Sequence, residues 1–224
     1  PSLRGAAAVS RRRLAGAARP TVTLAGGSLA FTTSSRPSVA QILVSVDVTL
    51  NPWSTNNARY SSHTATISGA SATVDLGGGT RIVTIGNLAD DVYVDVSTPI
   101  TNGGLTKNGA GTLRLSGANT FSGPVTVNAG VLRLNNAAGF SSNSAIIVNG
   151  GTLDMNGITD TIASLAGTGG AISQDAAGLT LGATSGSTTF AGAITGPGTF
   201  TKNGAATEIL SGNNSLHFRT TELR

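Results

Sequence analysis

The sequence predicts an all-β protein, a solenoid of short strands preceded by a disordered basic arm. Three observations lead to this fold class. A short strand pattern recurs about every twenty residues, because residues 110–115 return at 129–134 and residues 127–134 return at 148–155. The 31 glycines interrupt most windows, and β-branched residues dominate between them, which disfavours helices. Only 11% of the residues are charged, against about 25% in an average globular domain.

The arm is expected to cover residues 1–41. This stretch is rich in Ala, Arg, Ser, Pro and Gly and has little periodicity beyond Val22 and Leu24, which favours disorder. It carries six arginines and no acid, so the net charge is +4 for the chain and −2 for the remainder. A mildly acidic body offers no broad patch for phosphates, and we expect no nucleic acid on the core. Two interpretations explain this basic arm: a segment that binds anionic surfaces such as nucleic acid or lipid, or a flexible leader. The arginines are Arg4, Arg11, Arg12, Arg13, Arg19 and Arg36.

The order of elements follows from the periodicity. Residues 42–50 alternate apolar and polar side chains and predict a half-buried strand, which Pro52 ends, so residues 42–65 are expected to be a strand with a polar connection. The coil repeats are expected over 66–215, and residues 216–224 leave the repeat. Residues 73–76 stand about two periods before 112–115 and indicate the same register. Further strands are predicted at 82–85, 92–96, 145–148, 152–155, 161–165, 179–181, 189–194 and 199–202.

Side chains that alternate along each strand define an inside and an outside. Leu113 and Leu115 are predicted to point inward, and the same holds for the pairs Leu132 with Leu134 and Leu153 with Met155. One turn per period would stack these pairs about 4.8 Å apart. The outward column is then Arg114, Arg133 and Asp154, and we expect an exposed ion pair between Arg133 and Asp154, worth less than about 1 kcal/mol.

The corners between strands are expected at small and polar residues. Glycine suits a positive φ or a close backbone approach, and asparagine tolerates left-handed geometry. The predicted corner residues are Gly109, Gly111, Gly117, Gly130, Gly150 and Gly151, together with Asn108, Asn128 and Asn149.

Residues 105–123, followed by 126–132, resemble the passenger-associated strand repeat of bacterial autotransporters, and a second copy starts at residue 200 and continues through 210–215. The resemblance covers about 68–215. It implies a right-handed parallel β-helix (solenoid) on or released from a bacterial surface, serving as a stalk or adhesion scaffold. The partners it implies are molecules of a host or neighbouring cell. It places the outer-membrane anchor, a barrel, outside the given chain. No signal peptide or membrane-spanning run is recognisable, so we expect a fragment that inserts into no membrane itself.

The second copy departs from the first at residues 207–210. Glu208 falls on an inward position and Ile209 on an outward one, and a buried unpaired carboxylate is costly. We therefore expect either a one-residue slip of this strand or fraying of the coil. Open coil ends also expose strand edges, which allows self-association.

One group of residues suggests chemistry. Asp91, Tyr93 and Asp95 share one face of a predicted strand, and such groups bind sugars or calcium, which leaves a β-helical polysaccharide lyase or hydrolase as the alternative function. The two carboxylates, however, are about 13 Å apart along a strand. A solvated outer face is the simpler interpretation.

Other catalytic or metal sites lack their usual residues. There is no Cys, and His63 and His217 stand apart in the non-repeat margins. Glycines at 77–79 and 167–170 lack the Lys-Ser/Thr of a phosphate loop. Trp53, Tyr60 and Phe121 are too scattered for a stacking platform. We expect no catalytic, cofactor or metal residues and no enzymatic activity.

Overall fold

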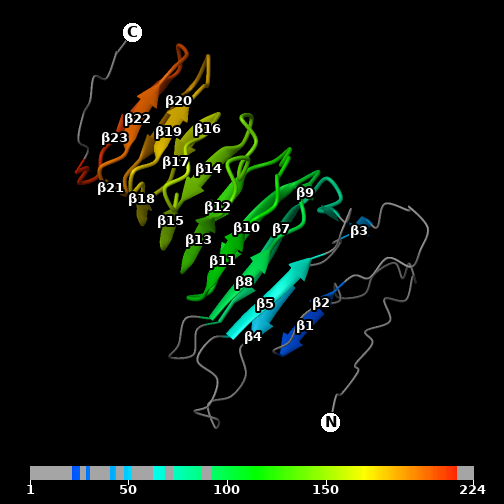
Figure 1. Ribbon diagram of the computed structural model, residues 1–224. Helices are drawn as coiled ribbons and strands as arrows, with labels where there is room; N and C mark the ends of the chain where they lie inside the picture. The colour runs from blue at the N-terminus through cyan, green and yellow to red at the C-terminus, as the bar shows by residue number, and fades with distance from the viewer. Residues whose placement is uncertain are drawn as a thin grey trace, which may run out of the picture.

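The chain folds into a coil of short parallel strands stacked along one axis (Figure 1). The computed structural model describes residues 22–25, 29–30, 41–43, 48–51, 63–68, 73–86 and 92–215. These residues contain strands and no helix. All strand pairs are parallel and join neighbouring turns, so the predicted parallel β-helix is confirmed.

The coil has three sides, and a sheet runs along each of them. Sheet A holds β1 (Val22–Ala25), β4 (Val48–Asn51), β7 (Thr80–Ile85), β10 (Gly104–Asn108), β12 (Val125–Val127), β14 (Ala145–Val148) and β17 (Ser164–Ala166). A bridge between Gly167 and Phe190 extends it to β20 (Ser187–Phe190) and β23 (Thr207–Leu210). Sheet B holds β2 (Leu29–Ala30), β5 (His63–Ser68), β8 (Val92–Val96), β11 (Thr112–Leu115), β13 (Val131–Leu134), β15 (Thr152–Asp154), β18 (Ala171–Ser173) and β21 (Ala193–Thr195).

The third side, sheet C, is interrupted. It begins with β3 (Gln41–Leu43), β6 (Thr73–Asp75) and β9 (Ile100–Thr101) and resumes with β16 (Asp160–Ile162), β19 (Gly178–Leu181) and β22 (Thr199–Lys202). Between the two parts, Thr120 pairs with Thr101, and Phe140 N donates to the Asp160 carboxylate, so single residues continue the side where strands are missing.

The predicted repeat registers are confirmed in the strand pairs. Leu113 pairs with Leu132, and Leu132 pairs with Leu153, at the spacings of 19 and 21 residues expected from the sequence. In sheet A, Val127 pairs with Val148. A period of about twenty residues is therefore one turn.

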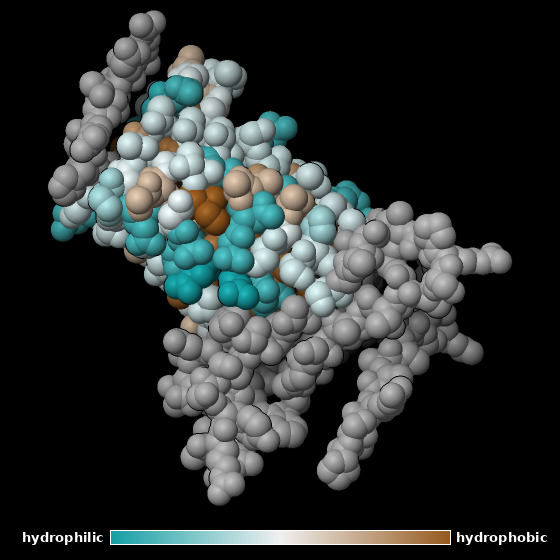
Figure 2. Space-filling view, viewed as in Figure 1, coloured by the Kyte–Doolittle hydropathy of each residue, from teal (hydrophilic) through white to brown (hydrophobic). Residues whose placement is uncertain are grey.

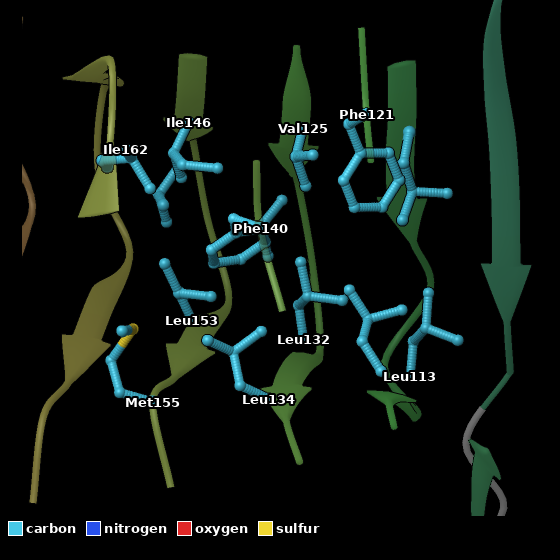
Figure 3. Packing of buried hydrophobic residues seen from close by; sticks show 14 of the residues in the cluster. Leu113, Phe121, Val125, Leu132, Leu134, Phe140, Ile146, Leu153, Met155 and Ile162 are labelled. Atoms are coloured by element: carbon cyan, nitrogen blue, oxygen red, sulfur yellow. The ribbon is translucent and has the colours of Figure 1, made fainter. Parts of the chain in front are cut away.

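The core is a set of inward columns that run along the coil axis. Leu113, Leu132 and Leu153 occupy successive strands of sheet B (Figure 3) and are at most 1% exposed. Phe121 and Phe140 fill the side where sheet C has no strands. Burial of one such leucine contributes about 1.5–3 kcal/mol. The inward positions predicted in the first repeat are all buried: Leu113, Leu115, Val127, Leu132, Leu134, Leu153 and Met155.

Three predicted strands are each two strands. Residues 42–50 divide between β3 in sheet C and β4 in sheet A, with 44–47 outside the described residues. Residues 161–165 divide into β16 and β17, and 189–194 into β20 and β21. In the last two cases only one or two residues separate strands of different sheets. Alternation of apolar residues continues through so tight a corner, and the pattern therefore hides it.

The N-terminal turns differ from the expected register. Residues 73–75 form β6 in sheet C, whereas Thr112 lies in sheet B, where Tyr93 and Thr64 occupy the two preceding turns. The turn from Thr64 to Tyr93 is therefore 29 residues long. A constant twenty-residue period fails here because this turn is longer.

Two strands fall inside the stretch expected to be a disordered arm. β1 lies at the Val22 and Leu24 periodicity and pairs with β4, and β2 pairs with β5. The remainder of 1–40 and the tail 216–224 lie outside the described residues. The coil thus includes strands ahead of residue 66, and the assigned boundaries at 41, 65 and 215 stay predictions.

The second repeat copy is rotated by one side of the coil relative to the first. In the first copy, residues 105–108 lie in sheet A and 112–115 in sheet B. In the second, the matching residues lie in β22 of sheet C and in β23, which extends sheet A. Strand β23 keeps its alternation, with Glu208 half-buried and Ile209 exposed, so the expected one-residue slip does not occur.

Candidate functional site: the outer column of sheet B

A column of four charged residues crosses the outer surface of sheet B. The register places Asp95 beside Arg114, Arg114 beside Arg133, and Arg133 beside Asp154, on β8, β11, β13 and β15. The order of charges along the axis is therefore acid, base, base, acid. Each arginine pairs with the acid on its far side, away from the other arginine.

The predicted ion pair between Arg133 and Asp154 is confirmed. Arg133 Nε lies 2.7 Å from Asp154 Oδ2, and the Arg133 side chain is 48% exposed. The column thus has the register that the twenty-residue period predicted, with one more acid, Asp95, at its N-terminal end.

Asp95 accepts more hydrogen bonds from side chains than Asp154, the other carboxylate of the column. Arg114 Nε and Nη2 donate to its two oxygens over 3.1 and 3.0 Å, and Ser116 Oγ donates over 2.5 Å. Burial raises the pKa of Asp95, but the hydrogen bonds from Arg114 and Ser116 and the Arg114 charge outweigh it and lower the pKa below its usual value. An ionised, fully engaged carboxylate is a poor general acid.

The structure describes only part of the candidate group formed by Asp91, Tyr93 and Asp95. Asp91 lies outside the described residues, and Tyr93 lies in β8 opposite Thr112. The one member whose side chain is described, Asp95, is 9% exposed and bonded to the next turn. These contacts indicate that Asp95 links two neighbouring turns.

Lys107 is a buried charge that the sequence analysis did not single out. It lies in β10 with the inward residues Val83 and Val127 on either side, and it is fully buried. Its Nζ donates to the carbonyl oxygens of Asn108, Gly109 and Ala129 over 2.9, 2.7 and 3.1 Å. Burial lowers its pKa to about 8.

The alternation itself could have revealed Lys107, because Leu105 is inward and Lys107 follows two residues later. Three carbonyl groups from two turns satisfy the ammonium group, and none of the carboxylates in the described part of the chain does. Lys107 therefore ties a corner of one turn to the corner of the next.

The corner glycines behave as predicted, but the asparagines do not. Gly109, Gly130 and Gly151 have φ near +70°, the left-handed region that favours glycine. Asn108, Asn128 and Asn149 are absent from the residues with positive φ. Instead they form a ladder, with Asn128 donating to Asn108 over 2.9 Å and Asn149 donating to Asn128 over 3.0 Å. Asparagines stacked at the same position of successive turns lie close enough for one amide to hydrogen-bond to the next, and this favours the ladder.

Two further buried polar residues replace strand pairing on the interrupted side. Asn119 accepts from Ile100 N of the preceding turn at 2.9 Å and donates to Gly139 O of the following turn at 2.9 Å. Asp160 accepts from Phe140 N and Thr161 N at 2.9 and 2.7 Å. Burial raises the pKa of Asp160, although these backbone hydrogen bonds oppose the rise. The sequence analysis missed both roles.

The other candidate features supply no site within the described part of the chain. Those residues hold no cluster of three metal-binding side chains and no helix long and apolar enough to cross a membrane. Glycines at 77–79 and 167–170 lie at corners, and Phe121 is in the core. His63 lies in β5, whereas Trp53, Tyr60 and His217 lie outside the described residues.

The comparisons with known proteins agree with this geometry. The family model described as passenger-associated-transport-repeat matches residues 105–134 and 200–216, which are the two copies found above. The chain carries the passenger-associated repeat of bacterial autotransporters. It is also 36% identical, over 179 residues, to a protein of Brucella suis biovar 1 (strain 1330) named adhesin BmaC autotransporter.

That similarity covers 75% of this chain and 5% of the Brucella protein, so the passenger segment corresponds to a small part of its relative. No solved structure matches the chain. The two repeat copies occupy different sides of one coil, and this shows that the autotransporter repeat specifies strands and corners and leaves its position around the axis open.

The outer surface of the coil carries mainly small and polar side chains. Figure 2 shows a face that is mostly intermediate or hydrophilic, with brown confined to small spots. Among the described residues, Ile209 is the large hydrophobic side chain that is exposed, at 48%. Thr, Ser and Asn take most outward positions of sheet A, for example Thr84, Thr106 and Thr126.

Proposed function

We propose that this segment is a structural part of an autotransporter passenger, a β-helical stalk or adhesion scaffold displayed on or released from a bacterial surface. The observation that carries the proposal is that buried charged and amide side chains of the described residues form hydrogen bonds from one turn to the next. Asp95, Lys107 and Asn119 are the main examples. The adhesin similarity of the Brucella relative supports the same role.

In this role the chain has no enzymatic activity. Cleavage of uronate polymers by the purified chain tests this, with Asp95→Ala as the informative variant. We expect no turnover above buffer. Turnover by the wild type that is lost in a still-folded Asp95→Ala variant would overturn the proposal in favour of a lyase or hydrolase.

The proposed partners are molecules on the surface of a host or a neighbouring cell. Beads coated with the chain should bind cultured cells, and binding should require the folded coil. Leu132→Asp puts a carboxylate into the inward column and should abolish it, whereas Thr180→Ala, on the outside of β19, should leave it unchanged. Equal binding by wild type and Leu132→Asp would contradict adhesion through the folded coil.

A further inference from the structure

The sequence contains five Asn–Gly pairs, and one of them lies in an open turn. The pairs begin at Asn102, Asn108, Asn149, Asn156 and Asn203. Asparagine is a thermolabile residue, and its side-chain amide reacts most readily when glycine follows, because glycine has no side chain to hinder attack by its own backbone nitrogen. Each pair is therefore a candidate modification site, and its surroundings in the fold decide whether it reacts.

Asn156 and Gly157 are the two central residues of a tight turn that follows β15. Their φ angles are +50° and +71°, and Ile158 N donates to Met155 O over 2.8 Å. Two positive φ angles closed by this hydrogen bond are typical of a type I′ turn, for which Asn–Gly is a preferred sequence. The closing hydrogen bond uses Ile158 N, so Gly157 N takes no part in it.

The space around this turn distinguishes it from the other four pairs. Asn156 and Gly157 are both exposed, and a Cβ built on Gly157 meets no atom within 4 Å. The other four glycines face backbone oxygens of a neighbouring turn so closely that a built Cβ would overlap them: Gly103, Gly109, Gly150 and Gly204. Four pairs are therefore packed against the next turn, whereas the turn at Asn156 has room to change its backbone angles.

Deamidation of an Asn–Gly pair requires this room. Gly157 N has to approach Asn156 Cγ to about 3–3.5 Å, and rotation about ψ of Asn156 brings the two atoms together. The rotation swings Gly157 through the space beside the turn. Local opening has a low free energy where few contacts are lost, as they are here. At the packed corners the same rotation would drive the glycine into backbone atoms.

We propose that Asn156–Gly157 is a site of spontaneous deamidation, and that its product weakens the link between this turn and the preceding one. Gly157 N loses its proton to water and forms a bond to Asn156 Cγ, and the Cγ–Nδ2 bond breaks to release ammonia. Water then opens the resulting succinimide ring at either carbonyl group. The product is an aspartate or an isoaspartate, and the net reaction consumes one water and releases one ammonia.

The product loses a hydrogen bond between turns. Asn156 Nδ2 donates to Leu134 O of the preceding turn over 3.0 Å, and Asn156 N donates to Asp154 Oδ1 over 2.8 Å. A carboxylate cannot donate to Leu134 O, and its charge lies close to Asp154, which binds Arg133 through its other oxygen. An isoaspartate also adds one carbon to the backbone of a two-residue turn. Both products therefore loosen the corner that follows β15.

Peptide mapping by mass spectrometry tests the proposal, after incubation at mildly alkaline pH, where the attacking nitrogen loses its proton more readily. Conversion of amide to acid is measured for all five pairs in the same sample. In the folded chain, Asn156 should react at least about tenfold faster than the other four asparagines, equivalent to about 1.4 kcal/mol in the barrier. In the chain unfolded by guanidinium chloride, the five rates should be similar, because glycine follows each asparagine.

Hydroxylamine provides an independent test, because it attacks the succinimide and cleaves the chain between residues 156 and 157. The folded wild-type chain should be cleaved at this bond. Asn156→Gln should resist cleavage, since glutamine would have to close a larger ring. Cleavage at the other four pairs should require unfolding.

The variant Asn156→Asp has the same chemical structure as one product. It should lower the urea midpoint of unfolding, because Leu134 O loses its donor. Asn143→Asp is the matched control, since Asn143 lies exposed in the loop after Phe140 and the substitution adds the same charge. The control should leave the midpoint nearly unchanged.

Three results would overturn the proposal. A folded chain in which Asn156 stays intact, while the unfolded chain reacts at all five pairs, would show that the turn keeps the amide away from Gly157 N. Equal rates at Asn156 and Asn108 in the folded chain would show that packing of the corners does not control the reaction. Equal midpoints for the wild type and Asn156→Asp would show that the product leaves the link between turns intact.

Discussion

Gly109 shows how closely successive turns approach at a corner. Its φ is +76°, and a Cβ built there would overlap Ile85 O of the preceding turn. Gly157 has nearly the same φ, +71°, with no atom within 4 Å of a built Cβ. The two positions separate the backbone cost of a left-handed conformation from the cost of a clash with the next turn.

We predict that Gly157→Ala lowers the free energy of unfolding by roughly 1–2 kcal/mol, the cost of a side chain in left-handed geometry. Gly109→Ala adds overlap with backbone atoms, which cannot move aside as a flexible side chain can. It should cost at least about 2 kcal/mol more. Urea denaturation of both variants measures this, and equal losses would show that the corner is not closely packed.

Because of Lys107, the free energy of unfolding should vary with pH in the alkaline range. Its pKa is about 8 in the folded chain and 10.5 by its ordinary value, so between these values the unfolded chain binds more protons. Stability therefore rises with pH in this window, because the charged lysine is costly to bury. Below about pH 8 the cost is present in full.

Lys107→Met isolates this contribution. The difference in unfolding free energy between wild type and Lys107→Met should shift in favour of the wild type by about 2 kcal/mol from pH 7.5 to 9.5. Comparison with the variant cancels the titration of other groups. A difference that stays constant over this range would mean that Lys107 has an ordinary pKa and reaches solvent.

At the scale of the strand, the outer column of sheet B links four turns with two ion pairs of different quality. The Arg133 and Asp154 pair has one close contact and a half-exposed arginine. The Arg114 and Asp95 pair has two contacts and a third donor, Ser116. Double-mutant cycles should give less than about 1 kcal/mol for the first pair and a larger value for the second.

The Asp95 pair should also weaken in acid. The pKa of Asp95 is lower in the folded chain than its usual 3.8, so its contribution is present above that value and disappears as the pH falls through the lower folded pKa. Coupling energies measured at pH 7 and near pH 3 check this. An Asp95–Arg114 coupling that is smaller than the Arg133–Asp154 coupling at pH 7 would contradict the assigned contacts.

The strands, the inward columns and the corner glycines of the repeats were predictable, whereas the tightest corners and the roles of the corner asparagines were not. Alternation fixes which side of a strand is buried, and it predicted Leu113, Leu132 and the pairing of Arg133 with Asp154. Alternation also continues across a one-residue corner, which is why 161–165 looked like a single strand. The roles of Asn119 and Asp160 depend on which backbone groups lack a partner, and only the three-dimensional path shows that.

At the scale of the whole coil, turn length varies while strand pairing persists. Paired positions are 19 residues apart from Thr112 to Val131 and 22 apart from Ala171 to Ala193. Extra residues enter at corners, where they do not disturb the ladders. The second repeat copy falls on another side of the coil because its distance from the first, 95 residues from Leu105 to Phe200, is not a whole number of turns.

The central claim is that one period of the sequence is one turn of the coil. Spin labels at Thr112→Cys and Ala193→Cys test it most directly, because the chain has no other cysteine. Thr112, Val131, Thr152, Ala171 and Ala193 form one column through four successive pairings. The distance measured between the labels by pulsed electron paramagnetic resonance should be narrow and near 19 Å, four steps of about 4.8 Å. A broad distribution at much longer distance would contradict the coil.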